Sequence, residues 1–454
     1  MVSAQSEIIA PERHRKQQSR QRVRSRLEET GETMANAGPY QGVTSSEKAM
    51  DRALDAGGGV LRLAPIWVPR AFCTPGKRIR LHPDDYFPLG KDRGGIDERW
   101  LASSIRADNG PLTDPFEGLS LVVEPDGGFI PFDEFVQHWK SDLVGKNWES
   151  RGGWPMYSKF FDNQFPLPFH IHHRDEHAAL VKKTGKPEAY YFPPQMNNHP
   201  GEFPHTFFGL HPETTKGQLL DKLIAFSQGG DNGITELSKA YRIALGTGWD
   251  VPAGVLHAPA SLCTYEPQAA SDVFAMAESW SNNREVPDDL MWKDVPPEKH
   301  GDFDFIIELV DWDKNVDPNL FSERFMTPLE TVHSREMGNP LVTENWITYK
   351  AKGFSAKELT VRPGGSVTIP DRDAYGLIAV GGFGTLNNHR LEATNSLRFG
   401  QLSTDEYFVS EPAARSGIVV SNLSPTEDLV ILKHFGPANE QLLEESPVLG
   451  ISQG

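Results

Sequence analysis

The chain has 454 residues and a formal net charge of −17, from 62 Asp and Glu against 45 Lys and Arg. This acidic balance argues against a nucleic-acid partner or an anionic membrane surface, and it weighs slightly against a strongly anionic substrate, although local charge can overrule the net charge. The length allows about two or three domains. The only two cysteines exclude a disulfide framework and favour a reducing compartment. Because the sequence also shows no secretory signal and no apolar stretch long enough to span a bilayer, we expect a cytoplasmic protein.

The first 58 residues differ in composition from the rest of the chain. Seven basic residues lie between Arg13 and Arg26, followed by polar residues with few hydrophobic ones. We interpret residues 1–58 as a basic and polar N-terminal arm, partly helical or disordered. The alternative is an arm that clasps the acidic body or a neighbouring subunit, in a homo-oligomer. Within it, Ser45 to Ala56 is expected to form a short helix that ends at Gly57.

The body of the protein begins with residues 60–68, which are mostly apolar and predict a strand. Residues 132–139 place apolar side chains at i, i+3, i+4 and i+7, which predicts a helix. Residues 156–162 predict another strand, and an Asp-Asn-Gln turn is expected to join it to residues 169–172 as a hairpin. This hairpin would bring Lys159 close to the histidines described next.

Three histidines and one glutamate form a candidate metal site. Alternate side chains of a strand share a face, so His170 and His172 point the same way. Glu188 starts a predicted strand rich in aromatic residues, and His257 follows a Pro-Ala-Gly turn on another short strand. Three imidazoles and a carboxylate suit Zn, Fe, Mn, Co or Ni. The competing interpretation is a satisfied polar cluster on a β-sandwich, since a His-x-His pair alone is a weak signal.

Between Glu188 and His257 the sequence predicts a mainly helical insertion, at about residues 212–246, placed where a lid over a barrel mouth would lie. Its two amphipathic stretches are residues 219–226 and 234–244. After Pro328 the pattern returns to short strands with Gly, Pro and Asp turns, and it contains neither a His-x-His nor a Pro-x-Gly-x-x-His motif. We therefore expect a second, structural unit without metal, with strands at residues 359–361, 366–369, 377–380, 417–420 and 429–432.

The order His-x-His, Glu, Pro-x-Gly-x-x-His is that of the two cupin motifs. At the level of ordered motifs, roughly residues 60–435 resemble the type I phosphomannose isomerase family, a branch of the cupins. His170 stands where this family has a ligand Gln. The segments that carry the resemblance are Asp97-Glu98-Arg99-Trp100, Met156 to Asp162, Phe169-His170-Ile171-His172, Lys186-Pro187-Glu188, Pro252 to His257, Glu266 and Ser271-Asp272.

The resemblance implies a mainly β fold with two cupin-type jelly-roll barrels and a small helical insertion. Residues 59–335 would form a metal-binding cupin domain, and residues 336–454 a second cupin-like barrel without metal ligands. The implied activity is a metal-dependent aldose–ketose isomerisation of a small-molecule sugar or sugar phosphate. The implied roles are His170, His172, Glu188 and His257 as ligands of one divalent metal, with Zn²⁺ as the first candidate; Glu266, Lys159 and Lys186 as catalytic groups, with Glu266 as base; and Glu98, Trp100, Asp272 and Arg284 as substrate-binding residues.

The sequence departs from the family pattern in two places. Pro168 replaces a Ser before the His-x-His motif. The family's Arg and Lys near the sugar phosphate fall by position on Met276 and Asn282, with Arg284 as a nearby replacement. Loss of both cations would remove charge-assisted contacts to a phosphate, so the sequence leaves open an unphosphorylated sugar.

Two other functions remain open. Three histidines and one glutamate with open coordination positions also suit a cupin metalloenzyme of another reaction class, such as a dioxygenase that uses Fe or Mn. The loss of the phosphate-binding cations also suits a sugar-binding cupin without catalytic activity.

Overall fold

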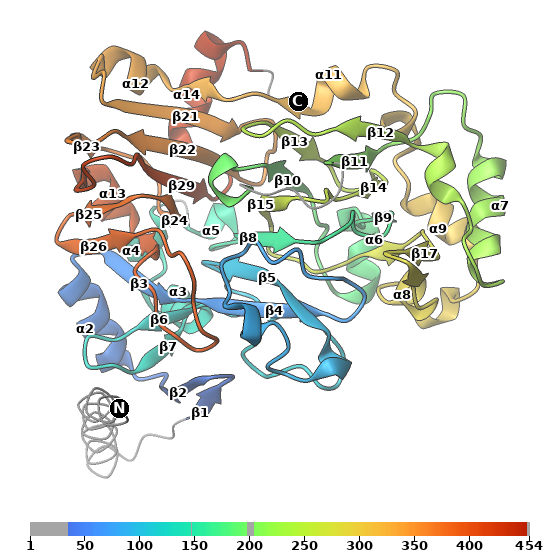
Figure 1. Ribbon diagram of the computed structural model, residues 1–454, viewed down its shortest axis with the longest axis horizontal. Coiled ribbons are helices and arrows are strands. Elements are labelled where there is room, and N and C mark those ends of the chain that lie inside the picture. Colours follow the sequence, from blue (N-terminus) through green and yellow to red (C-terminus); the bar gives the residue numbers. More distant parts are fainter. Residues whose placement is uncertain (1–34, 147, 198–203, 452–454) are drawn as a thin grey trace, which may run out of the picture.

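The protein is described here by a computed structural model that covers residues 35–146, 148–197 and 204–451. Its four main sheets stack as layers, which run from left to right in Figure 1 as sheets of four, eleven, seven and five strands. The fold is therefore mainly β, as expected. None of the sheets formed by these residues closes into a barrel.

The seven- and five-stranded sheets face each other in the first half of the molecule. Side chains from both, among them Phe208 and Trp249 with ring centroids 5.1 Å apart, fill the space between them. The seven-stranded sheet has the order β19 (Phe325–Met326), β13 (Gly248–Val251), β10 (Glu188–Tyr191), β15 (Cys263–Ala269), β8 (Met156–Asp162), β5 (Gly95–Leu101), β4 (Ile66–Arg70). The five-stranded sheet has the order β12 (Lys239–Arg242), β11 (His205–Phe208), β14 (His257–Ala258), β9 (His170–Ile171), β16 (Ala275–Met276), and a small hairpin pairs β17 (Trp280–Ser281) with β18 (Arg284–Glu285).

The second half packs the eleven-stranded sheet against the four-stranded sheet over an aliphatic core. All five strands predicted after residue 328 are confirmed here. The larger sheet has the order β1 (Ala35–Ala37), β2 (Tyr40–Val43), β7 (Phe129–Pro131), β6 (Leu121–Val123), β3 (Val60–Ala64), β27 (Glu406–Val409), β24 (Tyr375–Gly381), β29 (Leu429–Phe435), β22 (Ser355–Val361), β21 (Val342–Thr348), β20 (Leu329–Glu330). The smaller has the order β23 (Ser366–Ile369), β28 (Ile418–Asn422), β25 (Phe383–Leu386), β26 (His389–Glu392).

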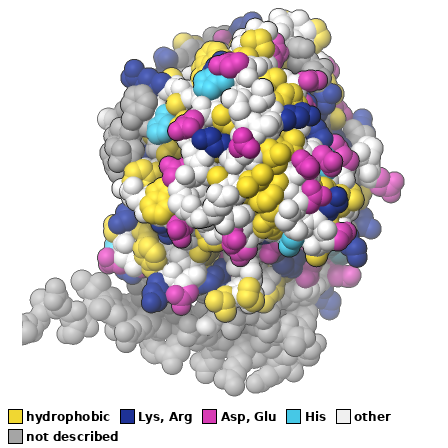
Figure 2. Space-filling view, turned by 90° about the vertical axis from the view of Figure 1, so that its right-hand side faces the viewer, with side chains coloured by type: hydrophobic (Ala, Val, Ile, Leu, Met, Phe, Trp, Pro, Cys, Tyr) yellow, Lys and Arg dark blue, Asp and Glu magenta, His cyan; other side chains and the backbone are white. Residues whose placement is uncertain are grey.

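Helices cover the outer face of the five-stranded sheet and the lower end of the second half (Figure 1). Figure 2 looks onto the first of these faces, where hydrophobic, acidic and basic side chains are interspersed. No helix of the described ranges is long and apolar enough to cross a membrane. The α-helices are α2 (Glu47–Gly57), α3 (Phe132–Trp139), α4 (Ser141–Val144), α5 (Trp148–Arg151), α6 (Asp175–Ala178), α7 (Lys216–Phe226), α8 (Asp289–Trp292), α9 (Phe303–Leu309), α10 (Trp312–Asn315), α11 (Leu320–Arg324), α12 (Val332–Met337), α13 (Glu411–Ser416) and α14 (Glu440–Leu449). Short 3₁₀ turns are η1 (Pro83–Asp85), η2 (Lys91–Arg93), η3 (Ala179–Val181), η4 (Pro194–Met196), η5 (Ile234–Leu237) and η6 (Pro297–Lys299).

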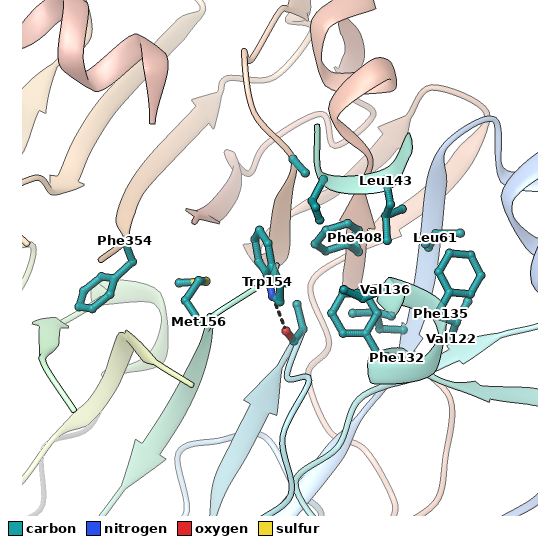
Figure 3. Packing of buried hydrophobic residues seen from close by; sticks show 14 of the residues in the cluster. Leu61, Val122, Phe132, Phe135, Val136, Leu143, Trp154, Met156, Phe354 and Phe408 are labelled. Carbon is teal, nitrogen blue, oxygen red and sulfur yellow. Dashed lines mark hydrogen bonds between the residues drawn. The ribbon is translucent and has the colours of Figure 1, made fainter. Parts of the chain in front are cut away.

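The two halves share strands and a core. Residues 60–68, predicted as one strand, form β3 and β4 in two different sheets, with Pro65 between them, because proline cannot donate to a continuous ladder. β3 pairs with β27 from the far end of the chain. Figure 3 shows the core at this junction, where Trp154 meets Phe408 edge-on with centroids 4.9 Å apart and donates a hydrogen bond to the carbonyl of Ala102. Burying each such aromatic side chain contributes about 1.5–3 kcal/mol.

Two local predictions are wrong and one is confirmed. β8 pairs with β15 and β5, whereas β9 pairs with β14 and β16, so the chain passes from one sheet to the facing one and makes no hairpin. Pro166 and Pro168 lie in this crossing, where they have no ladder to interrupt. In the insertion, α7 is helical as expected, but residues 239–242 form β12, because the edge of β11 offers them a partner.

The predicted arm lies only partly in the described ranges. Helix α2 confirms the helix expected before Gly57, and Gly58 ends it in the left-handed conformation that favours glycine. The basic run at residues 13–26 lies outside the described residues.

Candidate metal centre

Three histidines gather between the seven- and five-stranded sheets. His170 on β9 and His257 on β14 are direct partners across neighbouring strands, and His172 follows β9 on the same face as His170. Their ligand nitrogens all lie within 4.8 Å of one another, and all three rings are buried. The neighbouring Phe169 and Ile171 point to the opposite face, into the core under the helices, as expected for alternating side chains.

Each histidine is oriented by a backbone carbonyl. The Nδ1 atoms of His170, His172 and His257 lie 2.7, 2.7 and 2.8 Å from the carbonyl oxygens of Pro168, Val273 and Val255. A carbonyl only accepts, so each Nδ1 carries a hydrogen, and in a neutral ring the Nε2 keeps its lone pair. Burial lowers the pKa of His170 well below its usual value and that of His172 to about 3, so both rings are neutral at pH 7. This is the tautomer and charge state that metal ligands require.

Glu188 reaches the histidines from the facing sheet. Its carboxylate oxygens lie 2.9 Å from the Nε2 of His172 and 3.1 Å from the Nε2 of His257. The Tyr190 hydroxyl donates to the same carboxylate at 2.5 Å and the Lys186 ammonium at 2.7 Å. Burial alone would raise the pKa of Glu188, but the Lys186 ammonium holds it well below the usual range.

The donor set fits a divalent cation. The Nε2 of His257 is buried with no hydrogen-bond partner, and it faces a carboxylate oxygen that can only accept. An unprotonated Nε2 and a carboxylate oxygen at this distance repel each other unless a proton or a metal cation lies between them. Three imidazoles and one carboxylate suit Zn²⁺ and the other metals predicted from sequence.

A buried acid–base group lies beside the ligands. Glu266 on β15 is the cross-strand partner of Lys159 on β8, and its Oε1 lies 3.3 Å from the Lys159 ammonium and 3.7 Å from that of Lys186. Burial and the nearby Glu188 raise the pKa of Glu266 to about 8, against the opposing effect of the two lysines. Burial alone would lower the pKa of Lys159, but Glu266 and Glu98 raise it above its usual value, so Lys159 stays charged.

Three further charged side chains, Glu98, Arg70 and Asp272, extend outward from Lys159, and we call them the ring of charges. Glu98 accepts hydrogen bonds from the Lys159 ammonium at 3.1 Å and from the Trp100 indole at 2.8 Å. Arg70 lies 3.2 Å from Glu98 and binds Asp272 through both terminal nitrogens, at 3.0 and 3.2 Å. Burial alone would raise the pKa of Asp272, but Arg70 lowers it below its usual range. The arrangement links Asp272 to Lys159 through one continuous set of charge-assisted contacts.

The structure brings together ten of the predicted site residues and leaves one apart. Arg284 lies on β18, in the small hairpin, and within the described ranges its buried Nε and Nη2 atoms have no hydrogen-bond partner. Arg70 was missed by the sequence reasoning. The only indication in the sequence is its position as the last residue of the otherwise apolar strand Ile-Trp-Val-Pro-Arg. An arginine that is buried there requires a carboxylate partner.

Comparisons with known proteins support the fold alone. No family model matches the sequence, and no curated protein is significantly similar to it. Among solved structures, a single-residue variant of phosphomannose isomerase from Salmonella typhimurium matches with a TM-score of 0.56 and 11% identity over 84% of this chain and 100% of that one. Mannose 6-phosphate isomerase from Bacillus subtilis matches with a TM-score of 0.52 and 15% identity over 83% and 99% of the two chains. A protein from Archaeoglobus fulgidus assigned as a mannosephosphate isomerase matches with a TM-score of 0.54 and 15% identity over 84% and 98%.

Proposed function

We propose that this protein is a metal-dependent aldose–ketose sugar isomerase. The observation that carries the proposal is the buried histidine triad facing Glu188, with the buried pair Glu266 and Lys159 beside it. The isomerase fold of the structural neighbours supports the same reaction class, because their similarity extends over most of this chain.

His170, His172, His257 and Glu188 would hold one divalent cation, with Zn²⁺ as the first candidate. Bound there, the cation would supply electrophilic stabilisation of sugar oxygens. The carbonyls behind the three Nδ1 atoms keep the ligands oriented, and the Tyr190 hydroxyl fixes one carboxylate oxygen of Glu188. The four ligands are buried between two sheets, which limits the access of bulk water.

Glu266 would move the proton between neighbouring carbons of the sugar. An isomerase needs a base that removes a proton from one carbon and returns it, as an acid, to the next. A pKa near 8 allows both states near neutral pH, which suits a group that must alternate between them. The Lys159 and Lys186 ammonium groups, 3.3 and 3.7 Å from Glu266, would stabilise negative charge that develops on the sugar oxygens.

The architecture proposed with this function is two cupin-type jelly rolls. The seven- and five-stranded sheets would form the metal-binding unit, at residues 59–335, and the eleven- and four-stranded sheets the second unit, at residues 336–454, except that the eleven-stranded sheet also takes β1, β2, β3, β6, β7 and β20 from residues before 336. Within the described residues the second unit has no cluster of metal-ligating side chains. We place the protein in the cytoplasm on the same sequence arguments as above.

The test is hydrogen exchange at the second carbon of the sugar. Protein loaded with Zn²⁺, Mn²⁺, Fe²⁺, Co²⁺ or Ni²⁺ is incubated in D₂O with mannose, fructose, lyxose and their phosphates, and deuterium incorporation is followed by NMR. We expect exchange that requires both metal and protein. Absence of exchange with every sugar would overturn the proposal, and oxygen consumption in parallel samples would assign the site to a cupin oxygenase instead. Tight sugar binding without turnover would indicate a binding protein.

A further inference from the structure

A cavity of about 470 Å³ opens beside the ring of charges. Arg70 lines it at the end of β4, and the same guanidinium bonds to Asp272 and Glu98 inside the site. Phe274 lines it one residue after Val273, whose carbonyl orients His172. The cavity therefore adjoins the candidate site along two separate chains of contacts, through Arg70 and through Phe274.

The cavity walls suit the surface of a sugar. Phe72 and Phe274 lie with ring centroids 6.1 Å apart and offer apolar faces to sugar C–H groups. Asp92 and Asp289 add carboxylates that accept hydrogen bonds from hydroxyls.

Every cation of the cavity is already bonded to a carboxylate. Arg70 pairs with Asp272 and Glu98, and Arg93 binds both oxygens of Glu117 at 2.6 and 2.8 Å. The Lys293 ammonium lies 3.2 Å from Asp294 and 3.5 Å from Asp108.

The walls hold as many carboxylates (Asp92, Asp108 and Asp289) as cations (Arg70, Arg93 and Lys293), and a phosphate dianion would have to compete with the existing ion pairs to gain a charge-assisted contact. Arg284, the cation expected to contact such a group, is absent from the walls. A neutral polyol displaces none of these pairs.

We infer that this cavity binds the substrate and that the substrate is a neutral, unphosphorylated sugar. The inference rests on the proposed isomerase function and narrows it to one substrate class. Leu112, two-thirds exposed at the rim, gives a way to fill the cavity without disturbing the core. Leu423 is exposed to a similar extent on a loop of the second half and provides the matched control.

The experiment compares Leu112→Trp, Leu423→Trp and the unmodified chain, each loaded with Zn²⁺. Calorimetry measures binding of mannose, fructose and lyxose and of their phosphates, and deuterium exchange is measured with each. We expect binding of at least one neutral sugar, at least tenfold weaker binding of its phosphate, and at least tenfold weakening by Leu112→Trp with no change in Leu423→Trp.

Three outcomes overturn the inference: tighter binding of a sugar phosphate, no binding of any neutral sugar, or neutral-sugar binding that Leu112→Trp leaves intact. These outcomes are separable from failure of the proposed function. If a neutral sugar binds in this cavity without hydrogen exchange, the isomerase proposal fails and the assignment of the cavity stands. If hydrogen exchange occurs with sugar phosphates alone, the isomerase proposal stands and the inference of a neutral sugar fails.

Discussion

The geometry of the metal centre makes a specific prediction for the substitution Glu188→Gln. Glutamine has nearly the same shape as glutamate, and with its amide oxygen at the Oε2 position it can still accept from the Lys186 ammonium. Its amide nitrogen would then take the Oε1 position, where it donates to the Nε2 of His257 and gives up the hydrogen bond from the Tyr190 hydroxyl. The substitution therefore supplies a hydrogen-bond donor where the native site pairs two acceptors. We expect the metal-free variant to be at least as stable as the metal-free native protein, and we expect its response to metal to be lost.

The size of the effect follows from the loss of one ligand. Changing a group that merely orients a ligand weakens metal binding about 10–100-fold, so removing a ligand carboxylate should weaken it about 100-fold or more. With metal in excess of both dissociation constants, this ratio removes about 2.7 kcal/mol of metal-linked stabilisation. For a domain of about 150–250 residues, 1 kcal/mol shifts Tm by roughly 2–4 °C, so the metal-induced rise in Tm should fall by about 5–11 °C.

Chelator competition gives the affinity, and differential scanning calorimetry with and without Zn²⁺ gives the shift. Glu358→Gln is the matched control, because Glu358 accepts from the Tyr191 hydroxyl at 2.7 Å much as Glu188 accepts from Tyr190. Native-like Zn²⁺ affinity in Glu188→Gln would refute the assignment of Glu188 as a ligand. A destabilised metal-free variant would refute the reasoning about facing acceptors.

Three further substitutions test other parts of the site and fold. Glu266→Gln should reduce hydrogen exchange by about 10²–10⁴-fold and change Zn²⁺ affinity only a few-fold, and activity within tenfold of native would place the base elsewhere. Arg70→Met leaves buried Asp272 and Glu98 without their main cation and should cost about 3–5 kcal/mol in urea unfolding, so a loss below about 1 kcal/mol would contradict the role given to this pair. Burial lowers the pKa of His434 to about 3, so the unfolded chain binds the extra proton first and native stability should fall as the pH drops from about 6.5 to 3. His434→Gln should flatten that slope by up to about 1.4 kcal/mol per pH unit in denaturation measured across this range, and an unchanged slope would assign the acid sensitivity to other groups.

Part of the site could be predicted because it depends on local chain geometry. Alternation along an extended segment places His170 and His172 on one face, and the Pro-Ala-Gly turn delivers His257 to the neighbouring strand. The helix at residues 132–139 and the strands of the second half were predicted for the same reason, since hydrophobic periodicity is a local property.

The remainder depends on long-range pairing, which a single sequence encodes weakly. Nothing local to residues 156–172 distinguishes a hairpin from a crossing between two facing sheets, and the observed partners of β8 are β15, about a hundred residues further along the chain, and β5, which precedes it. Arg70 was missed for a similar reason: its partner Asp272 is 202 residues away, so their pairing appears only in the folded protein.

The pairing of β3 with β27 ties the two ends of the described chain into one sheet. A ribosome releases Val60–Ala64 long before it makes Glu406–Val409, so this ladder can form only when synthesis is nearly complete. Until then the edge of β3 that β27 later covers remains open to other extended segments. A message truncated after the metal-binding segments would therefore encode all four proposed ligands together with an unprotected strand edge, and its product would be prone to aggregate.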